Sequence, residues 1–256
     1  MATCKLCRDP LVFQIEDEAD KENAGKASAE EVPDDLELPC GCHFHWQCLL
    51  DESPAVTISF RCPSCESYLA TDESGASGSS STAASVASVI LAKYKNEGGL
   101  QPNFDILPAI TEEAYLSSHP EARPARAFQI MCSEGDVGGM VELLATIDDA
   151  NDGDVSAPSV LRYQDPLSNM KTGLHLAIER GQTDVALLLL WLCSTIPDGE
   201  FPEDGRQTAQ MLGVGRLAVD SNGDIRALKD SNGLTAGDHA RQFAGQWVAL
   251  FEAGLL

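Results

Sequence analysis

Cysteine and histidine side chains gather in the first quarter of this chain at spacings that suit metal binding. Seven of the nine cysteines fall between Cys4 and Cys65. With one histidine they form four close pairs, which are Cys4–Cys7, Cys40–Cys42, His45–Cys48 and Cys62–Cys65. A gap of one or two residues lets a tight turn aim two donor atoms at one ion. Four such pairs supply the eight ligands of two tetrahedral zinc sites.

The rest of the sequence indicates a reducing compartment for these thiols. The start of the chain, "MATCKLC", has neither the positive segment nor the long apolar run of a secretory signal. The longest apolar run, Val185–Cys193, is about half as long as a membrane-spanning helix. We therefore expect a cytoplasmic or nuclear protein without membrane contact. Thiols stay reduced there, which favours metal ligation over disulfides.

The negative charge of the chain argues against nucleic acid binding, which is a common role of zinc proteins. The 256 residues include 40 acidic and 17 basic side chains, for a formal net charge of −23. Such a chain repels phosphate backbones, so we expect no nucleic acid partner. The apolar content of 43% is enough for a buried core in one large or two small domains.

The order of the pairs resembles the RING finger family. RING fingers read Cys-x2-Cys, a long loop, Cys-x-His-x2-Cys/His-x2-Cys, a second loop and Cys-Pro-x-Cys. The likeness covers Cys4 to about Tyr68 and includes the runs "LPCG", "FHWQC" and "CPSC". One departure is Cys42, which stands where the family usually has histidine. With Cys42 as fourth ligand, His45 follows after the family's two-residue gap, so His43 is expected not to bind metal.

The resemblance also implies which pairs share an ion, because a RING finger cross-braces its ligands. The expected first site is Cys4, Cys7, His45 and Cys48, and the expected second site is Cys40, Cys42, Cys62 and Cys65. With every position filled by protein, both Zn²⁺ ions would be structural. Structural zinc contributes about 10–16 kcal/mol in finger peptides. We therefore expect residues 1–70 to form a small α+β domain that unfolds without zinc, with an acidic surface insertion at residues 8–39.

RING fingers of ubiquitin ligases bind a ubiquitin-conjugating enzyme through a shallow apolar groove. The positions that match this groove are Leu6, Leu49 and Pro63, while Ile58 and Phe60 either complete it or fill the core. Such a ligase has no nucleophile of its own and works by positioning a loaded conjugate beside a substrate.

Two departures from active ligases leave a second function open. No tryptophan lies between Cys48 and Cys62, and Glu66 stands where many ligases have an arginine or lysine that contacts ubiquitin. A carboxylate cannot donate those hydrogen bonds. The alternative to a ligase is a non-catalytic zinc-binding scaffold that joins proteins. A reader of basic histone tails is a third hypothesis, although the sequence shows no aromatic cage for it.

Residues 71–100 are expected to be a Ser/Gly-rich linker with a short helix at Val86–Lys95. Residues 101–256 contain a repeat, and its clearest copy, Thr172–Leu190, resembles the ankyrin repeat. In that family the matching threonine and histidine secure a turn by hydrogen bonds, so His175 is expected to be structural. Poorer copies are Phe128–Leu144 and Asp230–Gly254.

The expected second module is thus an all-α ankyrin-like stack of about three repeats that docks a protein substrate. A turn-rich insertion at residues 194–226 is expected to carry an extra helix near "RQTAQML". The run "GVGRLA" matches a dinucleotide fingerprint only on paper, because no strand-helix-strand pattern surrounds it. Cys132 and Cys193 lie in helical patterns and are expected to be small buried hydrophobic residues.

Overall fold

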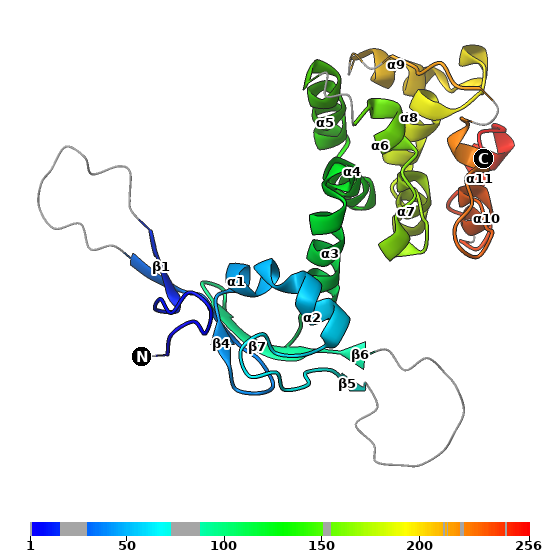
Figure 1. Ribbon diagram of the computed structural model, residues 1–256. Helices are drawn as coiled ribbons and strands as arrows, with labels where there is room; N and C mark the ends of the chain where they lie inside the picture. The colour runs from blue at the N-terminus through cyan, green and yellow to red at the C-terminus, as the bar shows by residue number, and fades with distance from the viewer. Residues whose placement is uncertain are drawn as a thin grey trace, which may run out of the picture. The chain divides into compact units, whose positions relative to one another are not determined.

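The computed structural model describes residues 2–15, 30–72, 88–150 and 155–256, apart from residues 212, 214, 221, 222 and 244 (Figure 1). The chain divides into two compact units, Met1–Ser118 and His119–Leu256. The first unit is mixed α/β with small antiparallel sheets, and the second is helical. Within the described residues, no helix combines the length and apolar character required to cross a membrane.

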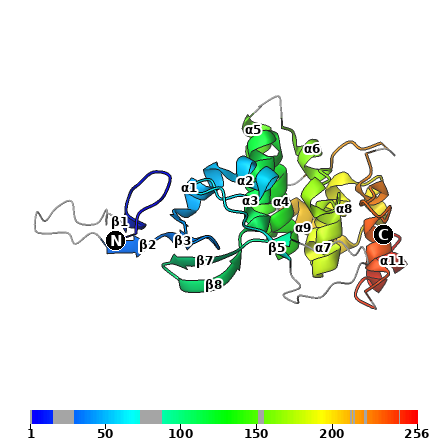
Figure 2. The same ribbon diagram turned by 60° about the horizontal axis from the view of Figure 1, so that its bottom comes forward.

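The main sheet of the first unit has four antiparallel strands, in the order β4 (His43–Phe44), β3 (Asp35–Glu37), β7 (Leu91–Asn96) and β8 (Gly99–Asp105). Leu36 is the central pairing point, because it lies opposite Phe44 on one side and Tyr94 on the other. Figure 2 shows β7 and β8 side by side. Leu36 and Phe44 are fully buried, so this sheet forms part of the core beneath the cysteine pairs.

The prediction of a helix at Val86–Lys95 is wrong, because the described part of this stretch contains strand β6 (Ser88–Val89) and most of strand β7. In "LAKYKN" the side chains of Ala92 and Tyr94 turn inward while their neighbours are exposed, which is the two-residue period of a strand. Gly98 and Gly99 lie where the chain turns from β7 into β8. Gly99 has φ +105°, a conformation that favours glycine.

Three helices cover the sheet, namely α1 (Trp46–Asp51), α2 (Ser53–Ser59) and α3 (Leu107–Ser118). Helix α3 packs against α2. The side chains of Ile90, Ile106 and Ile110 are fully buried in the same core as Leu49 and Val56. Residues 88–118 therefore complete the hydrophobic core of the cysteine-rich region.

The described ends of the acidic insertion at 8–39 form a two-stranded antiparallel sheet. Strand β1 (Val12–Ile15) pairs with β2 (Glu30–Pro33) in the register Val12 opposite Pro33. A second small sheet joins β5 (Thr71–Asp72) to β6 at the two ends of the expected Ser/Gly-rich linker. The middle of the insertion, 16–29, and the linker residues 73–87 lie outside the described residues.

The second unit is built from helices that pair along the chain. Helix α4 (Arg123–Glu134) packs against α5 (Val137–Ala150), and α7 (Gly173–Arg180) packs against α8 (Thr183–Cys193). The third pair is the two short consecutive helices α10 (Ala236–Ala240) and α11 (Val248–Glu252). Helix α7 packs against both α4 and α10, so the first helices of the three pairs form a row. Short helix α6 (Ala157–Leu161) lies between the first two pairs in the chain.

The three pairs coincide with the three copies found in the sequence. Gly135 and Gly181, which align in the repeat, both end a first helix in the left-handed conformation, with φ +86° and +76°. The insertion contains the expected extra helix, α9 (Glu203–Met211). Cys132 and Cys193 are fully buried in the core of this unit, as expected.

Candidate metal centres

The structure brings the first expected set of ligands together. The Sγ atoms of Cys4, Cys7 and Cys48 and a ring nitrogen of His45 all lie within 4.8 Å of one another. Cys4 and Cys7 come from the N-terminal turn, His45 directly precedes α1, and Cys48 lies on the first turn of that helix. Residues at the two ends of a long insertion therefore meet at one point.

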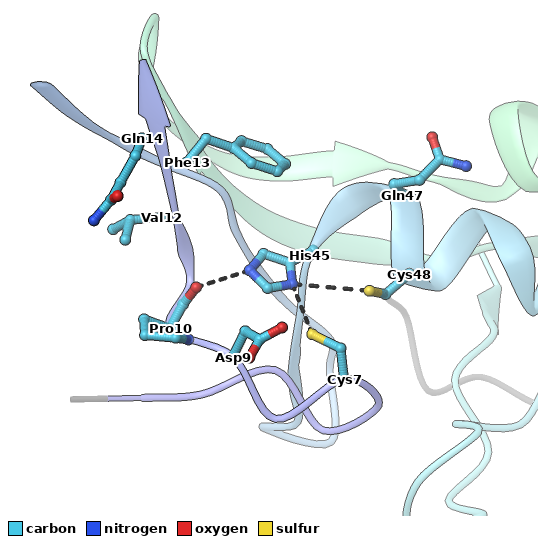
Figure 3. Close-up of a pocket in the computed structure, with 9 residues that line it drawn as sticks. All are labelled: Cys7, Asp9, Pro10, Val12, Phe13, Gln14, His45, Gln47 and Cys48. Atoms are coloured by element: carbon cyan, nitrogen blue, oxygen red, sulfur yellow. Dashed lines mark hydrogen bonds between the residues drawn. The ribbon is translucent and has the colours of Figure 1, made fainter. Parts of the chain in front are cut away.

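The orientation of the His45 ring suits metal ligation. Its Nδ1 atom lies 3.3 Å from Cys7 Sγ and 3.8 Å from Cys48 Sγ (Figure 3). Ligands of a tetrahedral zinc ion at the usual bond lengths have N···S separations of about 3.6 Å. The Nε2–H donates to the Pro10 carbonyl at 2.9 Å, which leaves the lone pair on Nδ1 toward the thiols. This hydrogen bond fixes the ring tautomer that a zinc ligand needs.

The second expected set also converges. The Sγ atoms of Cys40, Cys42, Cys62 and Cys65 lie within 4.8 Å of one another. Cys40 and Cys42 flank Gly41, whose φ of +80° makes the turn that aims both thiols the same way. Each cluster thus offers four donor atoms of types that structural zinc sites use, and each can hold one metal ion.

Crowded thiols shift one another's pKa in both clusters. Burial raises the pKa of Cys4, but backbone hydrogen bonds from His45, Leu6 and Cys7 outweigh burial and lower that pKa to about 6. Burial and the thiols of Cys4 and Cys7 raise the pKa of Cys48 to about 12. A second negative charge close to the first is unfavourable without a counter-charge. A divalent cation supplies that charge, so metal binding would release protons.

The second cluster likewise contains one thiol with a lowered pKa and one with a raised pKa. Hydrogen bonds from Ser67 lower the pKa of Cys65 to about 6. Burial, with smaller contributions from the thiols of Cys62, Cys65 and Cys42, raises the pKa of Cys40 to about 12. One thiol in each cluster is therefore ready to bind a cation at neutral pH, and another must lose its proton as the cation binds.

The structure separates the two neighbouring histidines. His43 lies on β4, and its Nδ1 is 2.7 Å from a carboxylate oxygen of Asp35 on the adjacent strand. It belongs to neither cluster, whereas His45 is part of the first. This placement agrees with the choice made from the two-residue gap after Cys42.

A buried carboxylate that the sequence did not single out holds the ligand-bearing helix. Asp34 is 1% exposed, and its two oxygens lie 3.3 and 3.1 Å from the backbone nitrogen of Trp46, the first residue of α1. A carboxylate at this place accepts a hydrogen bond from a free N–H, and its negative charge interacts favourably with the positive end of the helix dipole. Asp34 therefore fixes the start of α1, which directly follows the ligand His45 and carries the ligand Cys48.

A shallow apolar pocket of about 420 Å³ lies against the first cluster (Figure 3). Phe13 on β1 forms one wall, with its ring stacked on His45 at 5.8 Å between centroids. Gln47 and Cys48 of α1 form the opposite wall. The hairpin at the base of the acidic insertion therefore shields one side of His45.

The three residues expected to bind a partner differ in their exposure. Leu6 and Pro63 are partly buried within the turns of the first and last cysteine pairs. Leu49 lies on the buried face of α1 and is fully buried, so its expected place on a surface groove is corrected to a place in the core. Ile58 on α2 is 85% exposed and is therefore more accessible than Leu6, Leu49 and Pro63.

Comparison with known proteins gives no family for this chain, since no family model, curated protein or solved structure matches it significantly. The two Cys/His clusters therefore carry the functional argument.

Proposed function

We propose that this chain is a RING-type ubiquitin-protein ligase that carries two structural zinc ions. The observation that supports this most strongly is the interleaving of the clusters. The first and third pairs meet in one cluster, and the second and fourth pairs meet in the other. This interleaving supports a RING cross-brace, in which seven cysteines and one histidine would be the ligands. Closed four-ligand sites hold structure, so the ions would shape a docking surface.

The proposed docking surface for a ubiquitin-conjugating enzyme contains Leu6, Pro63 and Ile58. Leu6 and Pro63 each lie inside a cysteine pair, so zinc binding would fix both positions. Ile58 is 85% exposed, so its side chain is accessible to a partner. Leu49 would support this surface from below, by packing α1 onto the core.

The environment of Glu66 supports ligase activity despite its carboxylate. Glu66 is exposed just past the last cysteine, with φ +60°. Its backbone carbonyl accepts a hydrogen bond of 2.8 Å from the Arg61 guanidinium. A cation thus lies beside the position where many ligases have a basic residue. Arg61 would supply donors to ubiquitin that Glu66 cannot.

The second unit would hold the protein substrate as a short ankyrin-like stack. Its three helical pairs support this, and so does the turn before α7. There the Thr172 hydroxyl lies 2.8 Å from His175 Nδ1, and both residues are fully buried. This contact supports the hydrogen-bonded turn that the ankyrin resemblance implies. Stacked repeats bury a continuous core and leave an extended surface for a partner.

The alternative is a non-catalytic zinc scaffold that joins a RING partner to a repeat partner. Glu66 favours it, because the residue beyond the last cysteine repels acidic surfaces and cannot donate a hydrogen bond. A scaffold would bind zinc and partners equally well but would transfer no ubiquitin.

An autoubiquitination assay separates the two functions. Zinc-loaded full-length protein is mixed with activating enzyme, ubiquitin and a panel of conjugating enzymes. We expect ladders that disappear in Ile58→Ala and Pro63→Ala, whereas Leu100→Ala is unaffected. Leu100 is a matched control, since it is 63% exposed on β8 of the same unit. Absence of ladders from wild-type protein that still binds two zinc ions would favour the scaffold.

A further inference from the structure

The pocket beside the first cluster has an aromatic wall that a ligand can reach. Phe13 extends from β1, and its ring stacks on the His45 ring at an interplanar angle of 27° (Figure 3). This contact covers one face of the Phe13 ring, yet the residue is still 53% exposed. The other face is therefore accessible. The face of a phenyl ring attracts cations, because the negative part of its quadrupole lies there.

The polar groups around this ring favour a cationic ligand as well. Asp9 lines the pocket, and its carboxylate has no hydrogen bond or ion pair within the described residues. On the opposite wall the Gln47 amide donates to Asp51 at 2.9 Å, which leaves the Gln47 carbonyl oxygen as an acceptor. Lys5 and Arg8 belong to the neighbouring turn, but no lysine or arginine is among the described residues that line the pocket.

Metal in the first cluster would add negative charge to the same wall. Three thiolates and a neutral imidazole around a divalent ion leave an excess of negative charge. Cys7, His45 and Cys48 all line the pocket, so this excess would lie directly at its surface. The aromatic face, the free carboxylate and the metal-bound thiolates thus meet at one cavity of about 420 Å³, a size typical of pockets that hold small ligand groups.

We infer that this pocket binds an arginine side chain of a basic peptide. A guanidinium stacked on the open face of Phe13 would donate to the Asp9 carboxylate and the Gln47 carbonyl. Arginine fits better than lysine, because its planar group stacks on a ring and its five donors serve several acceptors at once. The pocket is shallow, so the peptide backbone can stay at the surface. A formal net charge of −23 would also attract a basic segment.

NMR titration of the zinc-loaded, ¹⁵N-labelled full-length chain tests this inference. The probe is a five-residue peptide of glycine and alanine with arginine at its centre, and the comparison peptides carry citrulline or lysine there. We expect the arginine peptide to shift the backbone amide signals of Val12, Phe13, Gln14 and Gln47. Citrulline keeps the shape of arginine without its charge, so its peptide should bind about tenfold more weakly. The lysine peptide should bind with intermediate affinity.

Two variants in the pocket are matched with two controls outside it. Phe13→Leu keeps an apolar side chain against His45 but removes the ring face, and should weaken binding by about twofold to fivefold. Asp9→Asn removes the charge of the carboxylate and should weaken binding by about tenfold. Leu100→Ala and Glu97→Gln change an exposed apolar and an exposed acidic side chain elsewhere in the same unit, and should bind as wild-type protein does.

The inference is overturned if either comparison peptide binds as tightly as the arginine peptide, or if no pocket signal shifts. It is also overturned if Glu97→Gln weakens binding as much as Asp9→Asn, since overall charge would then explain the attraction. Zinc content would be measured for every variant, and if one loses metal, the comparison of peptides on wild-type protein still decides. The inference rests on the first metal centre and not on ubiquitin transfer, so arginine binding by a chain that forms no ubiquitin ladders would refute the ligase function alone.

Discussion

The hydroxyl of Tyr94 donates a hydrogen bond of 2.9 Å to the carboxylate of Asp34, across 60 positions of sequence. The same carboxylate caps the helix that carries Cys48. Burial raises the pKa of Tyr94 to about 12, and the Asp34 carboxylate adds to this rise. Strand β7 is thereby tied directly to the start of the ligand-bearing helix.

This link predicts that Tyr94→Phe weakens the first metal centre. Removing the hydroxyl deprives the buried Asp34 of one donor, which costs about 1–3 kcal/mol of the free energy of unfolding. Thermal unfolding and chelator competition would measure the change. Tyr68→Phe is the control, because Tyr68 is 61% exposed in the same unit. Equal effects of the two variants would contradict the role of Tyr94.

The different surroundings of His43 and His45 predict different zinc contents for two similar variants. His45→Ala removes a donor from the first cluster and should bind less than two zinc ions per chain. His43→Ala disrupts only the contact with Asp35 and should keep both ions. Metal analysis of proteins purified without chelator measures this. A loss of zinc from His43→Ala alone would refute the assignment.

Zinc binding should strengthen as pH rises from about 5 to 8. Without metal, the pKa of Cys40 and that of Cys48 are both about 12, so these thiols keep their protons at neutral pH. Zinc must displace those protons, and a higher pH reduces the competition. Calorimetry in buffers with different ionisation enthalpies should show proton release on binding. Binding enthalpies that do not depend on the buffer would rule this out.

The first helix of the middle repeat should be sensitive to the residue that ends it. Gly181 has φ +76°, so Gly181→Ala should lower the free energy of unfolding of the second unit by about 1–2 kcal/mol. A Cβ there would also approach the side chain of Gln246 at 2.4 Å from Nε2. Gly199→Ala is the control, since nothing lies within 4 Å of its Cβ position and its φ is not positive. Urea denaturation would compare the two.

Local spacing was sufficient to predict the donor pairs of the metal clusters, and a weak repeat predicted the helical pairs. The eight donors lie in short motifs that are visible in the sequence, whereas the resemblance to RING fingers implied which pairs share a cluster and that His43 is not a ligand. The repeat was visible because Gly135 and Gly181 recur at matching places. The metal-binding motifs depend on residues that are close in the chain, and the helical pairs follow a repeat in the sequence.

Long-range pairing explains what the sequence analysis missed. The alternation in "LAKYKN" is that of a strand, but its partner, β3, lies more than fifty residues earlier. The short run was therefore mistaken for a helix. Leu49 was placed on a surface because nothing local shows that it belongs to the same buried core as Ile90, Ile106 and Ile110. Asp34 was overlooked because its hydroxyl donor, Tyr94, is equally remote.

The interleaved clusters set an order of events while the chain is being synthesised. The first cluster cannot close before Cys48 has left the ribosome, and the second must wait for Cys65. Strand β8, which completes the sheet, ends only at Asp105. The nascent chain therefore carries reduced thiols with an incomplete core for much of its translation. We expect its yield in cells to depend on zinc supply during synthesis more than on zinc added to the finished protein.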